Sequence, residues 1–220
     1  MLSAWLITTL ALAQEALDVG VIRESDMAVV QKNLYPKAGR TEVSIQAGVM
    51  PFDAWLTTPN LQLGIDKHTS ETIALSVALG GGYGFKTAPY RELESPAFGA
   101  APYAFRYLGS ALVGAEWSPV YAKMAWNGAK VVHFDIFGTA RGGVSVESSV
   151  IPAGGLAIAP TLSPGLGMRF FVGEKLAIRA EFRDDLLLEY RAITESFALK
   201  QNANVSLGVS ILSPVKRERK

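Results

Sequence analysis

The stretch from Glu71 to Phe85 carries the clearest pattern of hydrophobic and polar positions in the chain. Large apolar side chains from Ile73 to Phe85 share one parity, and Ala, Ser and Gly occupy most of the other parity. A period of two predicts a β-strand. One face of large apolar residues and one face of small residues are typical of a strand that spans a membrane, with lipid on the large side.

The same period of two recurs along most of the chain. Seven further segments show it, at 43–49, 61–66, 117–126, 131–146, 161–170, 176–183 and 204–211. With the first stretch, they predict an all-β fold, namely an eight-stranded antiparallel up-and-down transmembrane β-barrel. Each segment sets large apolar residues against small or polar ones, as the wall of such a barrel requires.

The connections between these segments alternate in length. Short connections are predicted at 67–70, 127–129 and 172–175, and long ones at 50–60, 86–115, 147–157 and 189–201. Outer-membrane barrels have short periplasmic turns and long outer loops, so both termini are expected on the periplasmic side. The second outer loop is long for a structureless segment, and we expect it to contain a short helix.

Charged residues within the strands fall on the parity opposite the large apolar ones. The predicted lumen network consists of Asp66, Lys123, His133, Asp135, Arg141, Arg169, Arg179, Glu181 and Arg183. Lys or Arg facing lipid near the midplane costs about 2–4 kcal/mol, so these side chains belong inside. The interior of an eight-stranded barrel is just wide enough to be filled by side chains. We therefore expect ion pairs, with Lys123 near Asp135 and with Arg169 and Arg179 near Glu181; a narrow pore is the alternative.

Two sets of exposed residues are predicted outside the lumen. The apolar part of the second outer loop is a candidate partner surface, made of Phe98, Tyr103, Phe105, Tyr107 and Leu112. Aromatic residues near the strand ends are expected at the two membrane interfaces, namely Trp55, Tyr83, Phe85, Trp126, Phe170, Phe171 and Tyr190. Trp117 falls on the inward parity and is an exception to this pattern.

The chain ends are predicted to lie outside the barrel. Residues 1–13 have an apolar core and a small-x-small ending, which indicates a signal peptide; a short buried helix is the other interpretation. Residues 14–40 form a periplasmic N-terminal tail, either a plug for the barrel mouth or a flexible leader. The barrel is expected at 41–213, and a basic C-terminal tail follows at 214–220.

Composition narrows the possible functions. The chain has 220 residues, a net charge of +1, no cysteine and a mean hydropathy of +0.21. Without cysteine there is no disulfide framework or thiolate metal site, and without a basic face nucleic acid is not an expected partner. His68, on a predicted turn, and His133, in the lumen, do not suggest a shared metal site or a catalytic triad. We expect no cofactor and no enzymatic activity.

Four short segments together resemble an outer-membrane β-barrel domain family of myxobacteria and related delta-proteobacteria. They are Tyr35 to Arg40, Trp117 to Lys123, Val132 to Phe137 and Ala180 to Asp184. The resemblance implies an eight-stranded barrel in the outer membrane of a Gram-negative bacterium, in contact with outer-membrane lipid and lipopolysaccharide. The family has no settled activity, but some members are associated with envelope complexes such as motility machinery. By analogy we expect a structural or partner-binding role with other envelope proteins, in a motility complex or another envelope complex.

Two rival interpretations remain at this stage. A secreted soluble barrel would turn the large apolar parity inward to hold an apolar ligand. An outer-membrane lipid-modifying enzyme would need a nucleophile and a base near the outer loops, where the sequence has no histidine.

Overall fold

The computed structural model describes residues 34–126, 130–151, 155–191 and 195–214. The chain divides into two units, Met1–Leu34 and Tyr35–Lys220, and the fold reported below is that of the second. The predicted signal peptide and most of both predicted tails lie outside the described residues.

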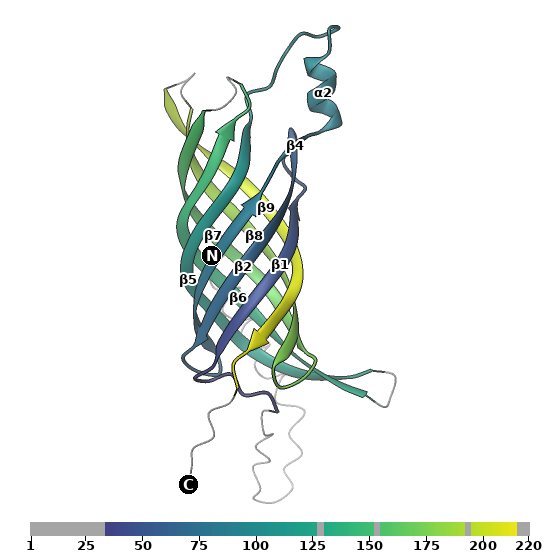
Figure 1. Cartoon of the computed structure of the whole chain (residues 1–220), viewed down its shortest axis with the longest axis vertical. Coiled ribbons are helices and arrows are strands. Elements are labelled where there is room, and N and C mark those ends of the chain that lie inside the picture. Colours follow the sequence, from purple (N-terminus) through teal and green to yellow (C-terminus); the bar gives the residue numbers. More distant parts are fainter. Residues whose placement is uncertain (1–33, 127–129, 152–154, 192–194, 215–220) are drawn as a thin grey trace, which may run out of the picture. The chain divides into compact units, whose positions relative to one another are not determined.

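The described residues form strands and one short helix, drawn in Figure 1. In chain order these are β1 (Thr41–Met50), β2 (Leu56–His68), β3 (Ile73–Gly82), β4 (Phe85–Lys86), α2 (Ala88–Glu94), β5 (Phe105–Trp126), β6 (Lys130–Ser149), β7 (Leu156–Phe171), β8 (Leu176–Arg191) and β9 (Ser196–Leu212).

Eight of the strands close into a ring. Each of β1, β2, β3, β5, β6, β7, β8 and β9 pairs antiparallel with the next, and β1 pairs with both β2 and β9. The two-residue β4 only lengthens the sheet beside the start of β2. A closed ring leaves no strand edge along the barrel wall without a hydrogen-bonded neighbour. The predicted eight-stranded antiparallel barrel is confirmed.

The two ends of the barrel differ. At one end, called the turn end, lie the β2–β3, β5–β6 and β7–β8 connections, the start of β1 and the end of β9. The other end, called the loop end, carries α2, which stands above the ring in Figure 1. Pro89 occupies the first turn of α2, where its missing N–H costs nothing, and Tyr90 is the buried residue of the helix. The short helix predicted in the second outer loop is therefore present.

The second outer loop is shorter than predicted, because β5 begins at Phe105. A bulge between Tyr107 and Gly109 shifts the register and breaks the period of two that would have revealed this part of the strand. Tyr107 and Leu112 point into the barrel and are buried, and Phe105 is buried as well. The candidate partner surface is therefore wrong for these three residues.

The remaining members of that surface, Phe98 and Tyr103, do lie in the loop, and Phe98 is exposed. The other loop-end connections are also shorter than predicted, at 51–55, 150–155 and 192–195, because the flanking strands run further.

A second irregularity in β5 explains Trp117. The register shifts between Trp117 and Val120, where Pro119 has no N–H to donate to the ladder. Residues on the two sides of this bulge therefore follow different parities. Trp117 points outward with 60% of its surface exposed, so its predicted inward orientation is wrong.

The outer surface of the barrel is apolar and the inside is polar. Large aliphatic side chains such as Leu63, Val77 and Val113 are exposed on the wall, whereas Arg179, Glu181 and Arg183 are buried within it. This is the reverse of a water-soluble barrel, which would bury its large apolar side chains. The soluble-carrier interpretation is wrong for this reason. No helix in the described part of the chain is long and apolar enough to cross a membrane.

Candidate functional site in the ionic lumen

Arg169 of β7 lies within the lumen and contacts three carboxylates from three other strands. Its Nε donates to Glu42 Oε1 at 3.0 Å, its Nη2 to Glu116 Oε1 at 2.5 Å and its Nη1 to Asp135 Oδ2 at 3.0 Å. A guanidinium carries five N–H donors in one plane and stays protonated when buried. This side chain therefore links β7 to β1, β5 and β6 across the interior.

Arg179 of β8 makes a similar set of contacts beside it, since the two arginines are cross-strand neighbours. Its Nη1 donates to Asp66 Oδ2 at 2.8 Å, and its Nη2 donates to Glu116 Oε2 at 2.7 Å. Glu116 thus gives one oxygen to each guanidinium. Both arginine side chains have no exposed surface, so each depends on these carboxylates to offset the loss of water.

An aromatic ring lies against both guanidinium groups. The Cζ atom of Arg179 is 4.2 Å from the centroid of the Phe137 ring, and that of Arg169 is 5.1 Å from it. Both distances suit cation–π attraction. A side chain at Gly167 would collide with this ring, which explains why the neighbouring strand has glycine there.

Two further arginines extend the network towards the loop end. Arg141 donates from Nη1 to Glu181 Oε1 at 2.6 Å and from Nε to Ser76 Oγ at 2.9 Å. Arg183 Nε lies 3.2 Å from Asp185 Oδ1. The prediction that Glu181 would pair with the arginines holds for Arg179, at 3.4 Å, whereas the carboxylates that contact Arg169 are the three named above.

The structure places most of the predicted lumen residues together. Those buried inside the barrel are Asp66, His133, Asp135, Arg141, Arg169, Arg179, Glu181 and Arg183. Lys123 is exposed, and it lies beyond Trp117, where the pairing of β5 with β3 ends. The predicted Lys123–Asp135 pair is wrong, and Asp135 instead contacts Lys37 and Arg169.

The sequence did not predict several members of the network, among them Glu116, Lys37, Glu42 and His68. Glu116 fell between the predicted connection 86–115 and the predicted strand 117–126, and Lys37 was assigned to the tail. Glu42 stood on the polar parity of its strand, which was a usable signal. His68 is not part of a turn: it is the buried last residue of β2, and its Nε2 lies 3.0 Å from Glu42 Oε2.

Residues 35–40 close the turn end of the lumen. Lys37 is buried and its Nζ donates to Asp135 Oδ2 at 2.5 Å. The Tyr35 ring stacks on Phe171 with centroids 5.2 Å apart and meets the edge of His133 at the same distance. This part of the predicted tail therefore packs into the barrel end.

Arg40 anchors the same segment to the barrel rim. It donates to the backbone oxygens of Ser213, Glu174, Pro36 and Leu212, at 2.5, 2.5, 3.1 and 3.3 Å. Burial lowers the pKa of Arg40, and nearby carboxylates oppose that shift. A guanidinium remains charged under these conditions, so the anchor persists at physiological pH.

Replacing Lys37 with Met is expected to lower the free energy of unfolding by about 1–3 kcal/mol, because Asp135 loses a charged donor while remaining buried. Urea unfolding of the reconstituted protein measures this change. Lys175→Met is the matched control: Lys175 is exposed in the β7–β8 connection at the same end, and a change within about 0.5 kcal/mol is expected there. Equal effects of the two substitutions would contradict the role given to Lys37.

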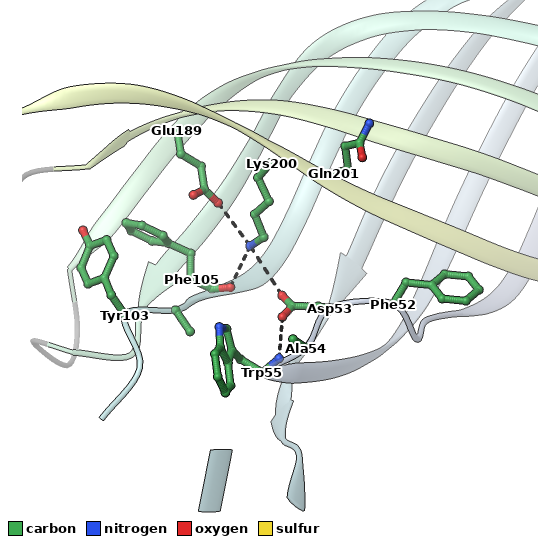
Figure 2. Close-up of a pocket in the computed structure, with 10 residues that line it drawn as sticks. Phe52, Asp53, Ala54, Trp55, Tyr103, Phe105, Glu189, Lys200 and Gln201 are labelled. Atoms are coloured by element: carbon green, nitrogen blue, oxygen red, sulfur yellow. Dashed lines mark hydrogen bonds and ion pairs between the residues drawn. The ribbon is translucent and has the colours of Figure 1, made fainter. Parts of the chain in front are cut away.

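The loop end contains a cavity of about 270 Å³ beside Lys200. Figure 2 shows the Lys200 ammonium reaching towards Glu189, Asp53 and the Phe105 carbonyl. Nζ donates to the Phe105 oxygen and to Glu147 Oε1, both at 3.0 Å, and lies 3.2 Å from Glu189 and 3.9 Å from Asp53. One lysine thus links β9 to the β1–β2 connection and to strands β5, β6 and β8.

Above this cavity α2 packs on the barrel mouth. Tyr90 meets the Trp55 ring edge-on, with centroids 6.5 Å apart, and lies in a small apolar cluster with Leu56, Ala104 and Val150. Trp55 therefore packs against the loop and lines the cavity, and its predicted position at the lipid interface is wrong.

The other predicted interfacial aromatic residues lie at the two ends of the barrel. Tyr83, Phe85 and Tyr190 are exposed near the loop end, while Phe170 is half-buried and contacts Phe134 near the turn end. The predicted interfacial position of Phe171 is wrong, because its side chain is on the inward parity and is buried under Tyr35. The side chain of Trp126 lies outside what the structure describes.

Asp184 departs from the apolar outer face. It lies between the inward-pointing Arg183 and Asp185 on β8, and it is half-buried on the outer parity. The β7–β8 ladder is interrupted opposite it, between Leu162 and Gly165, where Pro164 has no N–H. A carboxylate facing lipid costs less than a basic residue there.

The chemistry of the lumen is that of a cross-linked interior. Among the described residues, no group of three or more His, Cys, Asp or Glu side chains could hold a metal ion. Most of the carboxylates contact guanidinium or ammonium groups from another strand or from residues 35–40, and such contacts are found from Lys37 at the turn end to Lys200 at the loop end. Such an interior holds the strands together and occupies the space of a channel.

A closed antiparallel barrel with an apolar outer wall and an ionic interior defines the class of transmembrane β-barrels. No family model and no curated protein sequence matches the chain. Among solved structures, it is similar to Ail of Yersinia pestis, with 12% identity, a TM-score of 0.43, and coverage of 80% of this chain and 99% of Ail.

It is also similar to Neisserial surface protein A, with 9% identity, a TM-score of 0.47 and coverage of 78% and 95%. For the outer membrane protein OprG from Pseudomonas aeruginosa, the identity is 10%, the TM-score 0.45 and the coverage 84% and 100%. The fold assignment rests on the strand order and register of the chain itself.

Proposed function

We propose that this protein is an outer-membrane β-barrel of a Gram-negative cell envelope, with a closed lumen and a structural or partner-binding role. The observation that carries the proposal is the combination of an apolar outer wall with the buried network around Arg169 and Arg179. The outer wall requires lipid, and the network fills the space through which a solute would pass.

The proposed orientation places the turn end in the periplasm. Among the described residues, the connection that carries a helix, between β3 and β5, lies at the opposite end, as outer loops do. Both ends of the barrel chain, at Thr41 and Leu212, are then periplasmic. The proposed partners are outer-membrane lipid, lipopolysaccharide and other envelope proteins, and the family resemblance favours a motility complex or another envelope complex.

A structural role rather than an enzymatic one is favoured by what surrounds each ionisable lumen group. The carboxylates of Glu42, Glu116 and Glu181 contact arginines, which remain protonated and cannot serve as a base. At the loop end, the charged groups of the cavity pair with Lys200.

The closed lumen predicts the electrical behaviour of the purified protein. In planar lipid bilayers we expect insertion without steady ion conductance, because charged side chains and residues 35–40 block the lumen. The variant Lys37→Met tests the contribution of the turn end, and it is expected to conduct no more than transiently, since the central network remains. A large steady conductance of the unmodified protein would show an open pore, and a small current carried by protons alone would favour a narrow proton path.

A further inference from the structure

Strands β5 and β6 continue beyond the ring as a two-stranded ribbon. The pairing of β3 with β5 ends at Ile73 and Trp117, and the pairing of β6 with β7 ends at Phe171 and His133. The two strands nevertheless remain paired with each other as far as Trp126 and Lys130. Figure 1 shows this ribbon extending sideways from the turn end of the barrel.

One face of the ribbon is apolar. The bulge after Trp117 sets its register: Met124 pairs with Val132 on this face of the ribbon. Nearer the ring, where β6 still pairs with β7, Val120 pairs with Ile136 and Ala122 with Phe134 on the same face. Val120 is 43% exposed and Met124 is 39% exposed. Ile136 lies on the lipid-facing wall of the barrel, so the apolar outer surface continues along the ribbon without a polar interruption.

The charge of the ribbon has one sign. From Ser118 to Phe134 the sequence holds two lysines, Lys123 and Lys130, and no acidic residue. Lys123 is exposed on the face opposite Met124. The other two described connections at this end, 69–72 and 172–175, are short, and each carries a glutamate, Glu71 or Glu174. The ribbon thus joins an apolar face to a positive charge at the turn end.

We propose that the ribbon lies in the headgroup region of the membrane leaflet at the turn end, with its apolar face against acyl chains and Lys123 at anionic lipid phosphates. The proposal rests on the proposed function, because it requires the barrel to span a membrane. Continuity of the apolar surface with the lipid-facing wall favours lipid as the occupant. Pro119 and Lys123 lie along the unpaired edge of β5, and both residue types oppose the addition of a partner strand.

A lipid-supported ribbon has a mechanical consequence. It enlarges the footprint of the barrel in one direction only, and it attaches the turn end to the leaflet independently of residues 35–40. Polar side chains with long aliphatic stems, such as lysine, suit this depth, because the stem stays in the apolar zone while the ammonium reaches the phosphates.

The absence of cysteine from the sequence permits a direct test with single-cysteine variants. Met124→Cys, Lys123→Cys and Ile136→Cys are each labelled with a nitroxide and reconstituted in vesicles of phosphatidylethanolamine and phosphatidylglycerol. Collisions with oxygen report acyl chains, and collisions with a water-soluble Ni(II) chelate report water. We expect the label at 124 to match the label at 136, favouring oxygen, and the label at 123 to favour the chelate.

A charge reversal adds a second measurement. In the Met124→Cys background, Lys123→Glu is expected to shift the label towards the chelate, because the attraction to phosphatidylglycerol is lost. Lys175→Glu, at the same end of the barrel but off the ribbon, is the matched control and should leave the label unchanged.

The outcomes distinguish failure of the ribbon proposal from failure of the proposed function. A label at 136 in lipid with labels at 123 and 124 both in water overturns the ribbon proposal and leaves the barrel in the membrane. A label at 136 in water overturns the proposed function itself. Shielding of 124 from both reagents overturns lipid contact, and spin–spin broadening would then identify a second copy as the occupant.

Discussion

Replacing Arg179 with Met is expected to lower the free energy of unfolding by about 3–5 kcal/mol, the usual cost of removing one partner from a buried ionic group. Arg179 gives hydrogen bonds to Asp66 at 2.8 Å and Glu116 at 2.7 Å, and Asp66 has no other arginine among its described contacts. Methionine fills much of the volume but leaves the carboxylate of Asp66 buried without a cation.

Urea unfolding in lipid vesicles, followed by tryptophan fluorescence and by heat-dependent migration on gels, measures the loss. Arg91→Met is the control, because Arg91 is exposed on α2 and donates only to the Lys86 carbonyl; a change within about 0.5 kcal/mol is expected. Glu116→Gln combined with Arg179→Met should cost less than the sum of the single changes, since the two residues share a contact. A loss for Arg179→Met no larger than the control would contradict the network.

Replacing Val77 with Arg is expected to destabilise the reconstituted barrel by about 2–4 kcal/mol and to reduce its insertion into vesicles. Val77 is exposed on the outer face of β3, between Ile65 of β2 and Val113 of β5, which are both apolar. A guanidinium placed there would face lipid, and its described cross-strand neighbours, Ile65 and Val113, carry no carboxylate.

The extent of folding after reconstitution gives the measurement, from the fraction that shows the compact, heat-sensitive form on gels. Phe98→Arg is the matched control, because Phe98 is exposed in the loop beyond the barrel and would remain in water. If Val77→Arg folded as well as the control and raised solubility without detergent, the outer wall would face water and the membrane assignment would fail.

The sequence was informative wherever a strand keeps one parity along its whole length. β3 and β9 follow their predicted alternation, because neither contains a bulge and each has one lipid-facing row. In β5 the two register shifts, beside Tyr107 and at Pro119, reverse the parity twice within one strand. A period-of-two argument cannot detect such reversals, and for this reason Leu112 was placed in a loop and Trp117 was placed inside.

Part of the candidate site could also be predicted from the sequence, and part could not. Burial of Arg169, Arg179 and Glu181 could be predicted, because a charge opposite a large apolar row has only the lumen to occupy. Their partners could not be predicted, since strands of a barrel tilt and their register brings together residues far apart in the chain. Arg169 meets Glu42, which is 127 positions away, and Lys37 meets Asp135, which is 98 positions away.

The alternation of apolar and small or polar residues by itself determined that this chain forms an eight-stranded barrel with an apolar outer wall and charges inside, because side-chain direction in a strand depends only on parity. The tertiary structure alone decided which charges pair, that residues 35–40 close one end, and that β5 and β6 extend past the ring. Those features follow from strand register and bulges, which are set only when the whole sheet closes into a barrel. A register shift of one residue then changes every contact between the two strands.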